Sequence, residues 1–421
     1  MRNWAGNIEY GARAVHEPTS VAELQELVRS ARRIRAIGAR HAFNELADTT
    51  GDLVSVASLP RRLDIDREAG TVTVDAGARY GDVGAALADG GLALHNLASL
   101  PHLSIAGAVA TATHGSGNRL GSLATAVVGL ELVGAGGELI TIGPDDERLD
   151  GAVVALGAVG IVTAVTLRVE PAEPWRQDVF EGLAFEAAVA NFEGVTAAAP
   201  VVSLFTDWVE PVTFAAWLKG PAGRVPAEPL DRPPALAGAQ PADADRHPIP
   251  GLSAVACTPQ LGVSGPWHER MPHFRLDHVP SAGAELQTEL FVERSAAGAA
   301  LAALRPLAPR LAPLVWITEV RTVAADRHWL SPAFERDVAG IHFTWKLDWP
   351  AVREAIGAVQ ATLAPFAPRP HWAKLFTLEP AVLRERLPGR ERFASLAADL
   401  DPDGVFRNDF VDRYVLEKRD E

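Results

Sequence analysis

The chain has 421 residues, 48% hydrophobic and 22% charged, which is ordinary for a water-soluble globular protein with at least two hydrophobic cores. The formal net charge of −14 argues against nucleic acid or a membrane surface as a partner, since both require clustered Lys and Arg. A single cysteine, Cys257, excludes an intrachain disulfide framework and a Cys-based zinc site. With an N-terminus of non-secretory type and no apolar run of about 20 residues, this composition predicts a cytoplasmic protein.

The first predicted elements are a helix and a strand that end in a short loop. Ser20 and Glu23 form a capping-box pattern ahead of an apolar stripe, which predicts a helix after Ser20. The segment IRAIGARHAFN, residues 34–44, then has strand character as far as Gly38. We expect Gly38 to adopt a backbone conformation closed to other residues, so that the loop presents His41 to a ligand.

Short strands alternate with Gly- and Ala-rich connections from about residue 1 to 170, which is typical of an α+β domain. A helix is predicted at 80–88, closed by the two glycines that follow it. The predicted strands of this half are 53–56, 71–77, 129–134, 138–142 and 161–169. A Gly-rich turn between 129–134 and 138–142 predicts a hairpin.

The segment NLASLPHLSIAGAVATATHGSG, residues 96–117, is dominated by small residues. Uncovered backbone N–H groups in such a segment make an anion nest suited to a pyrophosphate, and the alternative is a turn where two elements pack closely. The histidines at 95, 102 and 114 have no carboxylate or cysteine at ligand spacing, so no metal site is expected. No nicotinamide-type GxGxxG pattern and no GxxxxGK[ST] loop is present.

The second half, from 171 to about 375, contains most of the tryptophans and a proline-rich stretch at 226–251. That stretch is predicted to be an irregular loop, either a cover over a site or a disordered insertion. The strongest strand signals are VWITEVRTV at 315–323 and IHFTWKLDW at 341–349.

Two-residue periodicity places polar side chains on one face of each of these strands. Glu319 and Arg321 share a face, as do His342, Thr344 and Lys346. Lys374, inside the apolar run HWAKLF, adds a further cation. A face of this kind requires either a polar ligand or water above it, because burying such groups unpaired costs about 1 to 3 kcal/mol each. The alternative is a solvated sheet face.

Together these segments closely resemble the vanillyl-alcohol-oxidase type of FAD-binding proteins, and among them the bacterial alditol oxidases. The resemblance covers nearly the whole chain and is carried by NWAGNI near the start, RHAFN, the segment 96–117, ALGAVGIVT at 155–163, SLFTDW at 203–208, GPWHERMPHFR at 265–275, EVRTVAAD at 319–326, HFTW at 342–345 and RPHWAKLFT at 369–377. It implies a two-domain α+β fold, with an FAD-binding domain at 1–175, a sheet-based substrate-binding cap domain at 176–377 and a C-terminal segment at 378–421 that completes the body.

The resemblance also implies an FAD that is bound covalently through one histidyl link. His41 would be bonded through a ring nitrogen to the 8α-methyl of the flavin, and the turn 36–42 would hold the pyrophosphate. The further positions implied along the cofactor are Ala36, Ile37, Gly38, Ala39, Arg40, Ala42, Ser99, Ser104, Gly107, Ala108, Val109, Ala110, His114, Gly160, Val162, Thr344 and His371. A second link would need an additional cysteine, and Cys257 lies far along the chain from these segments.

The implied reaction is oxidation of the terminal primary alcohol of an alditol such as xylitol or sorbitol to the aldose, with O2 reduced to hydrogen peroxide. The substrate residues carried over from the resemblance are Ser99, Glu319, Arg321, Thr344 and Lys374. Lys374, supported by His342, is expected to take the hydroxyl proton, and Arg321 to orient the reacting oxygen. A hydroxy-acid substrate is disfavoured, because Glu319 would repel its carboxylate.

Two other functions stay open at this point. One is a sugar-lactone oxidase or dehydrogenase that uses another electron acceptor, and the other is a flavin-carrying sensor without turnover. A monomer is the default expectation, since no interface segment is evident.

Overall fold

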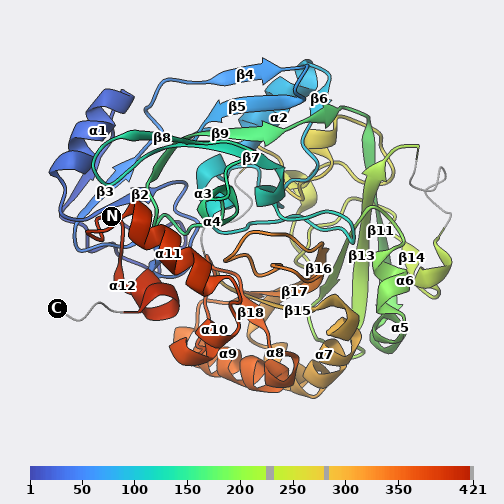
Figure 1. Ribbon diagram of the computed structural model, residues 1–421. Coiled ribbons are helices and arrows are strands. Elements are labelled where there is room, and N and C mark those ends of the chain that lie inside the picture. Colours follow the sequence, from blue (N-terminus) through green and yellow to red (C-terminus); the bar gives the residue numbers. More distant parts are fainter. Residues whose placement is uncertain (224–231, 279–283, 418–421) are drawn as a thin grey trace.

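The computed structural model of the protein describes residues 1–223, 232–278 and 284–417 (Figure 1). The N-terminal part contains a parallel three-stranded sheet in the order β1-β3-β2 and an antiparallel five-stranded sheet in the order β4-β5-β9-β7-β8. The strands of the first are β1 (Ala14–His16), β3 (Asp52–Ser55) and β2 (Ile34–Ile37). Those of the second are β4 (Leu63–Asp66), β5 (Thr71–Asp75), β9 (Ile161–Arg168), β7 (Val127–Val133) and β8 (Leu139–Ile142). A small pair joins β6 (Leu92–Ala93) to β10 (Glu170–Pro171).

The helices of this part are α1 (Val21–Ser30), α2 (Tyr80–Asp89), α3 (Ile105–Ala110) and α4 (Leu149–Ala152). The predicted hairpin is confirmed, with Gly134 donating to the carbonyl of Glu138 across the turn at 2.9 Å. Ser20 caps α1 as predicted, by accepting from the N–H of Glu23 at 3.2 Å. The reciprocal half of the capping box differs, because the carboxylate of Glu23 accepts from the N–H of Thr19 rather than from that of Ser20.

The second part is built on one antiparallel eight-stranded sheet in the order β14-β11-β13-β12-β16-β17-β15-β18. Its strands are β14 (Gln240–Pro241), β11 (Trp175–Ala184), β13 (Thr213–Pro221), β12 (Val201–Thr206), β16 (Val315–Val323), β17 (Val338–Trp345), β15 (Leu286–Glu293) and β18 (Arg369–Pro370). The helices around it are α5 (Phe185–Ala190), α6 (Phe192–Thr196), α7 (Ala297–Leu304), α8 (Ala308–Leu311) and α9 (Trp349–Leu363).

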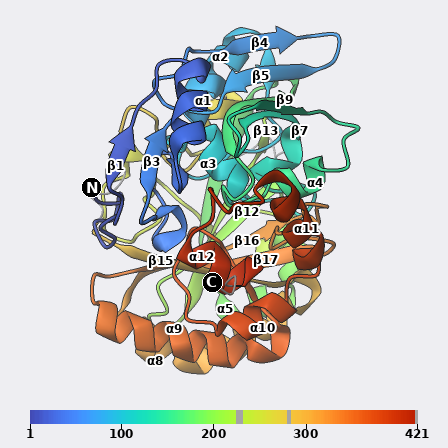
Figure 2. The ribbon, with the colours of Figure 1, turned by 60° about the vertical axis from the view of Figure 1, so that its left-hand side comes forward.

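Helices α7, α8 and α9 cover one face of this sheet (Figures 1 and 2). Their apolar side chains join those of the strands in one core, where Leu301 and Ile356 accompany Val320, Ile341 and Phe343. Alternate residues of β16 and β17 therefore point the other way. Of the polar residues predicted to share a face, Glu319, Arg321, His342 and Thr344 lie on that second side, toward the N-terminal part.

The chain ends on helices α10 (Pro380–Glu385), α11 (Arg390–Leu400) and α12 (Asp409–Val411). Leu383, Phe393 and Phe410 of these helices belong to the core of the N-terminal part rather than to that of the eight-stranded sheet. Among the described residues, no helix has both the length and the apolar character needed to cross a bilayer.

The prediction of a strand at 341–349 is wrong at its C-terminal end, where the strand stops earlier than predicted. β17 stops at Trp345, and the next helix begins at Trp349. Asp348 caps that helix by accepting from the N–H of Ala351, and a proline in the first turn supplies the backbone angle of a helix start. The cap and the proline override the strand preference of the aromatic residues in this run.

Candidate active site

One cavity of about 770 Å³ is lined by residues from both parts of the chain. Of the predicted site residues, the following lie in its wall: Ala36, Ile37, Gly38, Ala39, Arg40, His41, Ala42, Ser99, Ser104, Gly107, Ala108, Ala110, His114, Gly160, Val162, Glu319, Arg321, His342, Thr344, His371 and Lys374. Val109 does not line it, because its side chain is turned into the hydrophobic core, where it is 2% exposed. Tertiary structure thus brings the other residues together, and their chemical roles stay predictions.

The loop that bears His41 is held from outside by the N-terminal segment. The N–H of Trp4 donates to the carbonyl of Arg40 at 2.9 Å, and the side-chain amides of Asn3 and Asn7 donate to the carbonyls of residues 42 and 43 at 2.9 and 2.8 Å. Trp4 also stacks on the His41 ring, with the centroids 4.7 Å apart. This explains the NWAGNI motif, to which sequence analysis gave no role.

With its carbonyls engaged outward, the loop offers N–H groups to the cavity. Within the described parts of the chain, the N–H groups of Ala39, Arg40 and His41 meet no acceptor. Arg40 has a φ of 61°, in the left-handed region that non-glycine residues seldom adopt. Such a turn of consecutive unpaired N–H groups is the local structure that binds phosphate oxygens.

Gly38 does not have the unusual backbone conformation that was predicted for it. Its φ is not positive, and the left-handed residue of the loop is Arg40. A Cβ at 38 would lie 2.4 Å from Oγ of Ser104, so glycine lets the loop approach this hydroxyl without moving it. Close approach between the loop and the segment 96–117, rather than backbone angle, sets the residue type.

The close-packing alternative is confirmed for the segment 96–117, and its role as an anion nest stays a prediction. It packs closely against its neighbours, since a Cβ on Gly115 would lie 2.4 Å from the carbonyl of Leu97. It also lines the cavity through the short helix α3, where Gly107 and Ala108 leave room above the backbone.

The three strands at the floor of the cavity place polar side chains in register. In the ladders, His342 of β17 pairs with Glu289 of β15 on one side and with Glu319 of β16 on the other. Two residues further along β17, on the same face, Thr344 lies next to Gln287. The solvated-face alternative is therefore wrong, because Glu289, His342 and Glu319 are all buried.

Arg321 lies between the two carboxylates of this floor. Its Nη2 is 2.9 Å from Oε1 of Glu289, and its Nε is 3.5 Å from Oε2 of Glu319. Burial, the largest effect, would raise the pKa of each carboxyl, but Arg321 together with the neighbouring histidines offsets it, so both pKa values lie below the ordinary one for Glu. Burial alone would lower the pKa of Arg321, and the two carboxylates raise it above the ordinary arginine value. The floor of the cavity thus holds charged groups at neutral pH.

Lys374 and His342, the predicted proton acceptors, both line the cavity. Burial lowers the pKa of Lys374 to about 8, and burial followed by the charge of Lys374 lowers the pKa of His342 to about 3. Lys374 Nζ contacts Oε1 of Gln287 and lies 5.2 Å from the centre of the Phe43 ring. Neither ring nitrogen of His342 has a hydrogen-bond partner among the described residues. A buried imidazole without a partner is a group that a ligand hydroxyl would satisfy.

Lys346, predicted to share the polar face, does not belong to the cavity wall. The chain has already left the strand at this position, and Nζ donates to the carbonyl of Pro313 at 2.9 Å and lies over the Trp316 ring.

The reason given for expecting no metal is also corrected by the fold. His114, Glu289 and His371 each offer an atom within 4.8 Å of the others, although Glu289 is far along the chain from His114. Within the protein, Oε1 of this carboxylate is already 2.9 Å from Arg321 Nη2 and 3.1 Å from His114 Nε2. Its charge is balanced without an ion, and the absence of a metal stays a prediction.

Sequence analysis missed Gln287 and Glu289, although a signal was present. The run LQTELFVE at 286–293 places these two polar residues at i and i+2 between apolar ones, which is the pattern that identified Glu319 and Arg321. His273 lies in the motif GPWHERMPHFR and received no role, yet its Nε2 is 2.8 Å from Oε1 of Glu319. Nothing in the sequence near His273 indicates that partner.

The proline-rich stretch is partly a cover over the cavity. Residues 226–231 of it lie outside the described part of the chain. Of the remainder, β14 adds to the edge of the eight-stranded sheet beside β11, and His247, Pro248 and Ile249 line the cavity. The interpretation as an insertion without a place in the fold is therefore wrong for residues 232–251.

Comparison with known proteins assigns this chain to a family. Residues 12–143 match the model of the FAD binding domain, and residues 286–414 match that of D-arabinono-1,4-lactone oxidase. The alditol oxidase of Streptomyces sp. is 47% identical over 414 residues, which cover 98% of each chain. The chain belongs to the alditol oxidase family. More distant is the L-gulono-1,4-lactone dehydrogenase of Mycobacterium tuberculosis, 31% identical over 98% of both chains.

The fold expectation is confirmed for this member of the alditol oxidase family. The cholesterol oxidase of B. sterolicum superposes with a TM-score of 0.78 over 98% of this chain and 96% of its own, at 16% identity. The shared arrangement is the two-part α+β fold of the vanillyl-alcohol-oxidase type. The matched FAD-binding domain and the oxidase relatives identify the protein as an FAD-dependent oxidoreductase.

The residues present fit an FAD. The matched domain contains the loop 36–42, whose unpaired N–H groups suit a pyrophosphate, and the cavity wall there consists of small residues. Gly38 and Gly107 both leave space that a Cβ would take up against Ser104, at 2.4 and 2.8 Å from its Oγ.

Proposed function

We propose that this protein oxidises the terminal primary alcohol of alditols such as xylitol and sorbitol to the aldose, and that O2 is reduced to hydrogen peroxide. The observation that carries the proposal is a buried set of hydrogen-bonding side chains, Glu319, Arg321, His342 and Thr344, in the same cavity as the loop bearing His41. A neutral, many-hydroxyl substrate offers a donor or acceptor to each of them. The 47% identical relative is named alditol oxidase, which supports the same substrate class.

Oxidation of a primary alcohol removes the hydroxyl proton as a hydride leaves the carbon. When bound, FAD supplies the acceptor for that hydride and passes the electrons on to O2. We assign the hydroxyl proton to Lys374, because burial lowers the pKa of its ammonium to about 8 and leaves a fraction of neutral amine near pH 7. His342, neutral and without a partner among the described residues, supports it by donating its ring N–H to the oxygen of the same hydroxyl.

The other side chains hold the polyol. Arg321 orients the reacting oxygen, since its guanidinium is fixed between Glu289 and Glu319. Glu319 accepts from a further hydroxyl, with Thr344 and Ser99 as smaller partners. A hydroxy acid is a poorer substrate, because its carboxylate would face that of Glu319 in a water-poor cavity.

We propose that the cofactor is attached through one link, to His41. Burial lowers the pKa of His41 to about 4, so its ring is neutral and nucleophilic at neutral pH. A second covalent link, through Cys257, is not expected. This cysteine is absent from the cavity wall, and burial raises the pKa of its thiol to about 12.

We propose further that the enzyme acts in the cytoplasm, as a monomer and without a nucleic-acid or membrane partner. The single cysteine and the net charge of −14 support this assignment. Sedimentation of the purified protein tests the monomer, and a stable dimer would overturn it.

A sugar-lactone substrate is the second candidate, favoured by the match of residues 286–414 to the lactone oxidase model. Anaerobic mixing with xylitol, sorbitol or L-gulono-1,4-lactone separates the two. We expect the polyols to bleach the flavin absorbance faster than the lactone, and the reverse order would replace the proposal. Stopped-flow reoxidation in air-saturated buffer then tests the oxidase assignment, which slow reoxidation would remove.

A further inference from the structure

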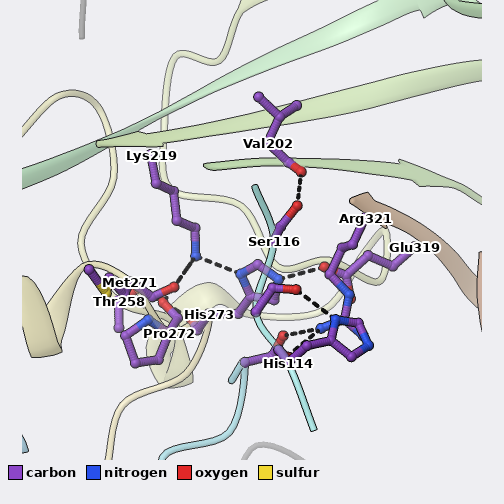
Figure 3. A network of polar contacts seen from close by, with 12 residues as sticks. His114, Ser116, Val202, Lys219, Thr258, Met271, Pro272, His273, Glu319 and Arg321 are labelled. Carbon is purple, nitrogen blue, oxygen red and sulfur yellow. Dashed lines mark hydrogen bonds and ion pairs between the residues drawn. The ribbon is translucent and has the colours of Figure 1, made fainter. Parts of the chain in front are cut away.

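A buried lysine lies behind Glu319, outside the wall of the cavity. Lys219 of β13 is fully buried, and its Nζ donates to the carbonyls of Met271 and Pro272 at 2.8 and 3.2 Å (Figure 3). The same Nζ is 2.7 Å from Nδ1 of His273. Burial lowers the pKa of Lys219 to about 7, and the charged form, with three N–H bonds for these three acceptors, is the one that satisfies every contact.

These contacts fix the tautomer of His273. Its Nε2 lies 2.8 Å from Oε1 of Glu319, a carboxylate that can only accept, so the ring proton is on Nε2. Nδ1 therefore accepts from the ammonium of Lys219. Burial, together with the charge of Lys219, lowers the pKa of His273 to about 4, so the ring carries a single proton at neutral pH. With one proton to place, the ring has one arrangement that satisfies both neighbours.

The two carboxylate oxygens of Glu319 therefore have different partners. Oε1 accepts from His273, while Oε2 is 3.5 Å from Nε of Arg321. Figure 3 shows Lys219, His273 and Glu319 following one another from β13 to the cavity floor. His273 and Glu319 line the cavity, and Lys219 does not.

A buried ammonium needs a reason to be retained. Replacing a buried ion by an apolar side chain of similar volume is often neutral or stabilising, so stability alone does not favour lysine over methionine at position 219. The two carbonyls that Lys219 holds belong to the segment 271–272, which a purely structural role would explain. The third contact, to the ring that holds a substrate-binding carboxylate, is not needed for that role.

We propose that Lys219 and His273 are positioning residues for Glu319. Lys219 fixes the His273 ring by donating to its Nδ1, and His273 holds one oxygen of Glu319 so that the other is presented to a substrate hydroxyl. This inference rests on the proposed function for the identity of the substrate. The hydrogen-bond order itself does not depend on it.

The first test reads the tautomer without turnover. In holoenzyme labelled with 15N-histidine, ring nitrogen shifts distinguish a protonated from an unprotonated nitrogen, and the His273 signals are those lost in His273→Gln. We expect Nε2–H in the native protein, and in Lys219→Met a shift of the Nδ1 signal, because that nitrogen loses its donor. Nδ1–H in the native protein, or an unchanged Nδ1 signal in Lys219→Met, would overturn the proposal. If polyols fail to bleach the flavin, this measurement still decides it.

The second test separates positioning from a structural role. In anaerobic flavin reduction by xylitol, Lys219→Met should raise the half-saturating concentration about tenfold, with the limiting rate changed less than about threefold. The matched control is Lys346→Met, which removes a lysine outside the cavity wall and should leave both values unchanged. In a His273→Gln background, where the amide can donate to Glu319 without help, Lys219→Met should add no further increase. A further tenfold increase of the half-saturating concentration in that background would contradict the proposal, as would a loss confined to the limiting rate. If Lys219→Met does not fold, the tautomer of His273 in the native protein decides the question.

Discussion

The side-chain amide of Asn44 donates to the backbone carbonyl of Lys374 at 2.8 Å, across a separation of 330 residues. The same amide donates to the carbonyl of Trp372 at 2.8 Å, and the N–H of Phe43 donates to that of Ala373 at 2.8 Å. The loop that bears His41 is thereby joined to the loop that bears the proposed base. The proposed cofactor attachment and the proposed proton transfer would therefore share this connection.

Asn44→Ala should therefore affect both stability and turnover. Removing a buried amide that donates twice is expected to lower the free energy of unfolding by about 1 to 3 kcal/mol. Because Lys374 is positioned by this contact, the rate of flavin reduction by xylitol should fall as well. Denaturant unfolding and stopped-flow reduction measure the two effects. The matched control is Asn118→Ala, whose amide donates to Thr196 away from the cavity, and an equal loss of rate there would contradict the argument.

His41→Ala should release the cofactor. Acid precipitation of the native protein is expected to leave the yellow colour in the pellet, because a covalent link survives unfolding. In His41→Ala the colour should move to the supernatant almost completely. His102→Ala, which alters another histidine of the same cavity, should keep the colour in the pellet. Colour in the supernatant of the native protein would refute the covalent link.

Lys374→Met should retain the flavin but lose polyol oxidation, by about 100- to 10,000-fold in the rate of reduction, which is the range for a lost general base. Burial lowers the pKa of Lys374 to about 8, and the neutral amine is the form that accepts a proton. The rate in the native enzyme should therefore rise with pH below about 8 and level off above it. If the rate falls as the pH rises over this range, or if Lys374→Met keeps the native rate, Lys374 is not the base and His342 becomes the candidate.

Gly38→Ala should weaken the cofactor site through a steric clash. The new methyl group would lie 2.4 Å from Oγ of Ser104, so the loop or the serine must move, at a cost of about 1 to 3 kcal/mol. Flavin content of the purified variant measures the effect. The double variant Gly38→Ala with Ser104→Ala removes the oxygen and should recover much of the loss. Failure to recover would mean that glycine is needed for another reason.

Much of this arrangement followed from local pattern. Two-residue periodicity identified Glu319 and Arg321 as neighbours on one face, and β16 has the predicted bounds, Val315–Val323. The Gly-rich turn identified the hairpin of β7 and β8 in the same way. These features depend on residues within one or two turns of chain, which a sequence displays directly. The resemblance then added the FAD and the substrate class.

Only the tertiary structure decided which distant groups meet. Glu289 and Glu319 lie on either side of His342 because β15 and β16 flank β17, and no local pattern encodes that strand order. The clash that requires Gly38 arises from Ser104 on another element, and the cap at Asp348 ends the strand that β propensity would have continued. The sequence by itself determined the residue types and their local faces. Packing determined their partners, because burial and charge compensation depend on what surrounds a side chain in space.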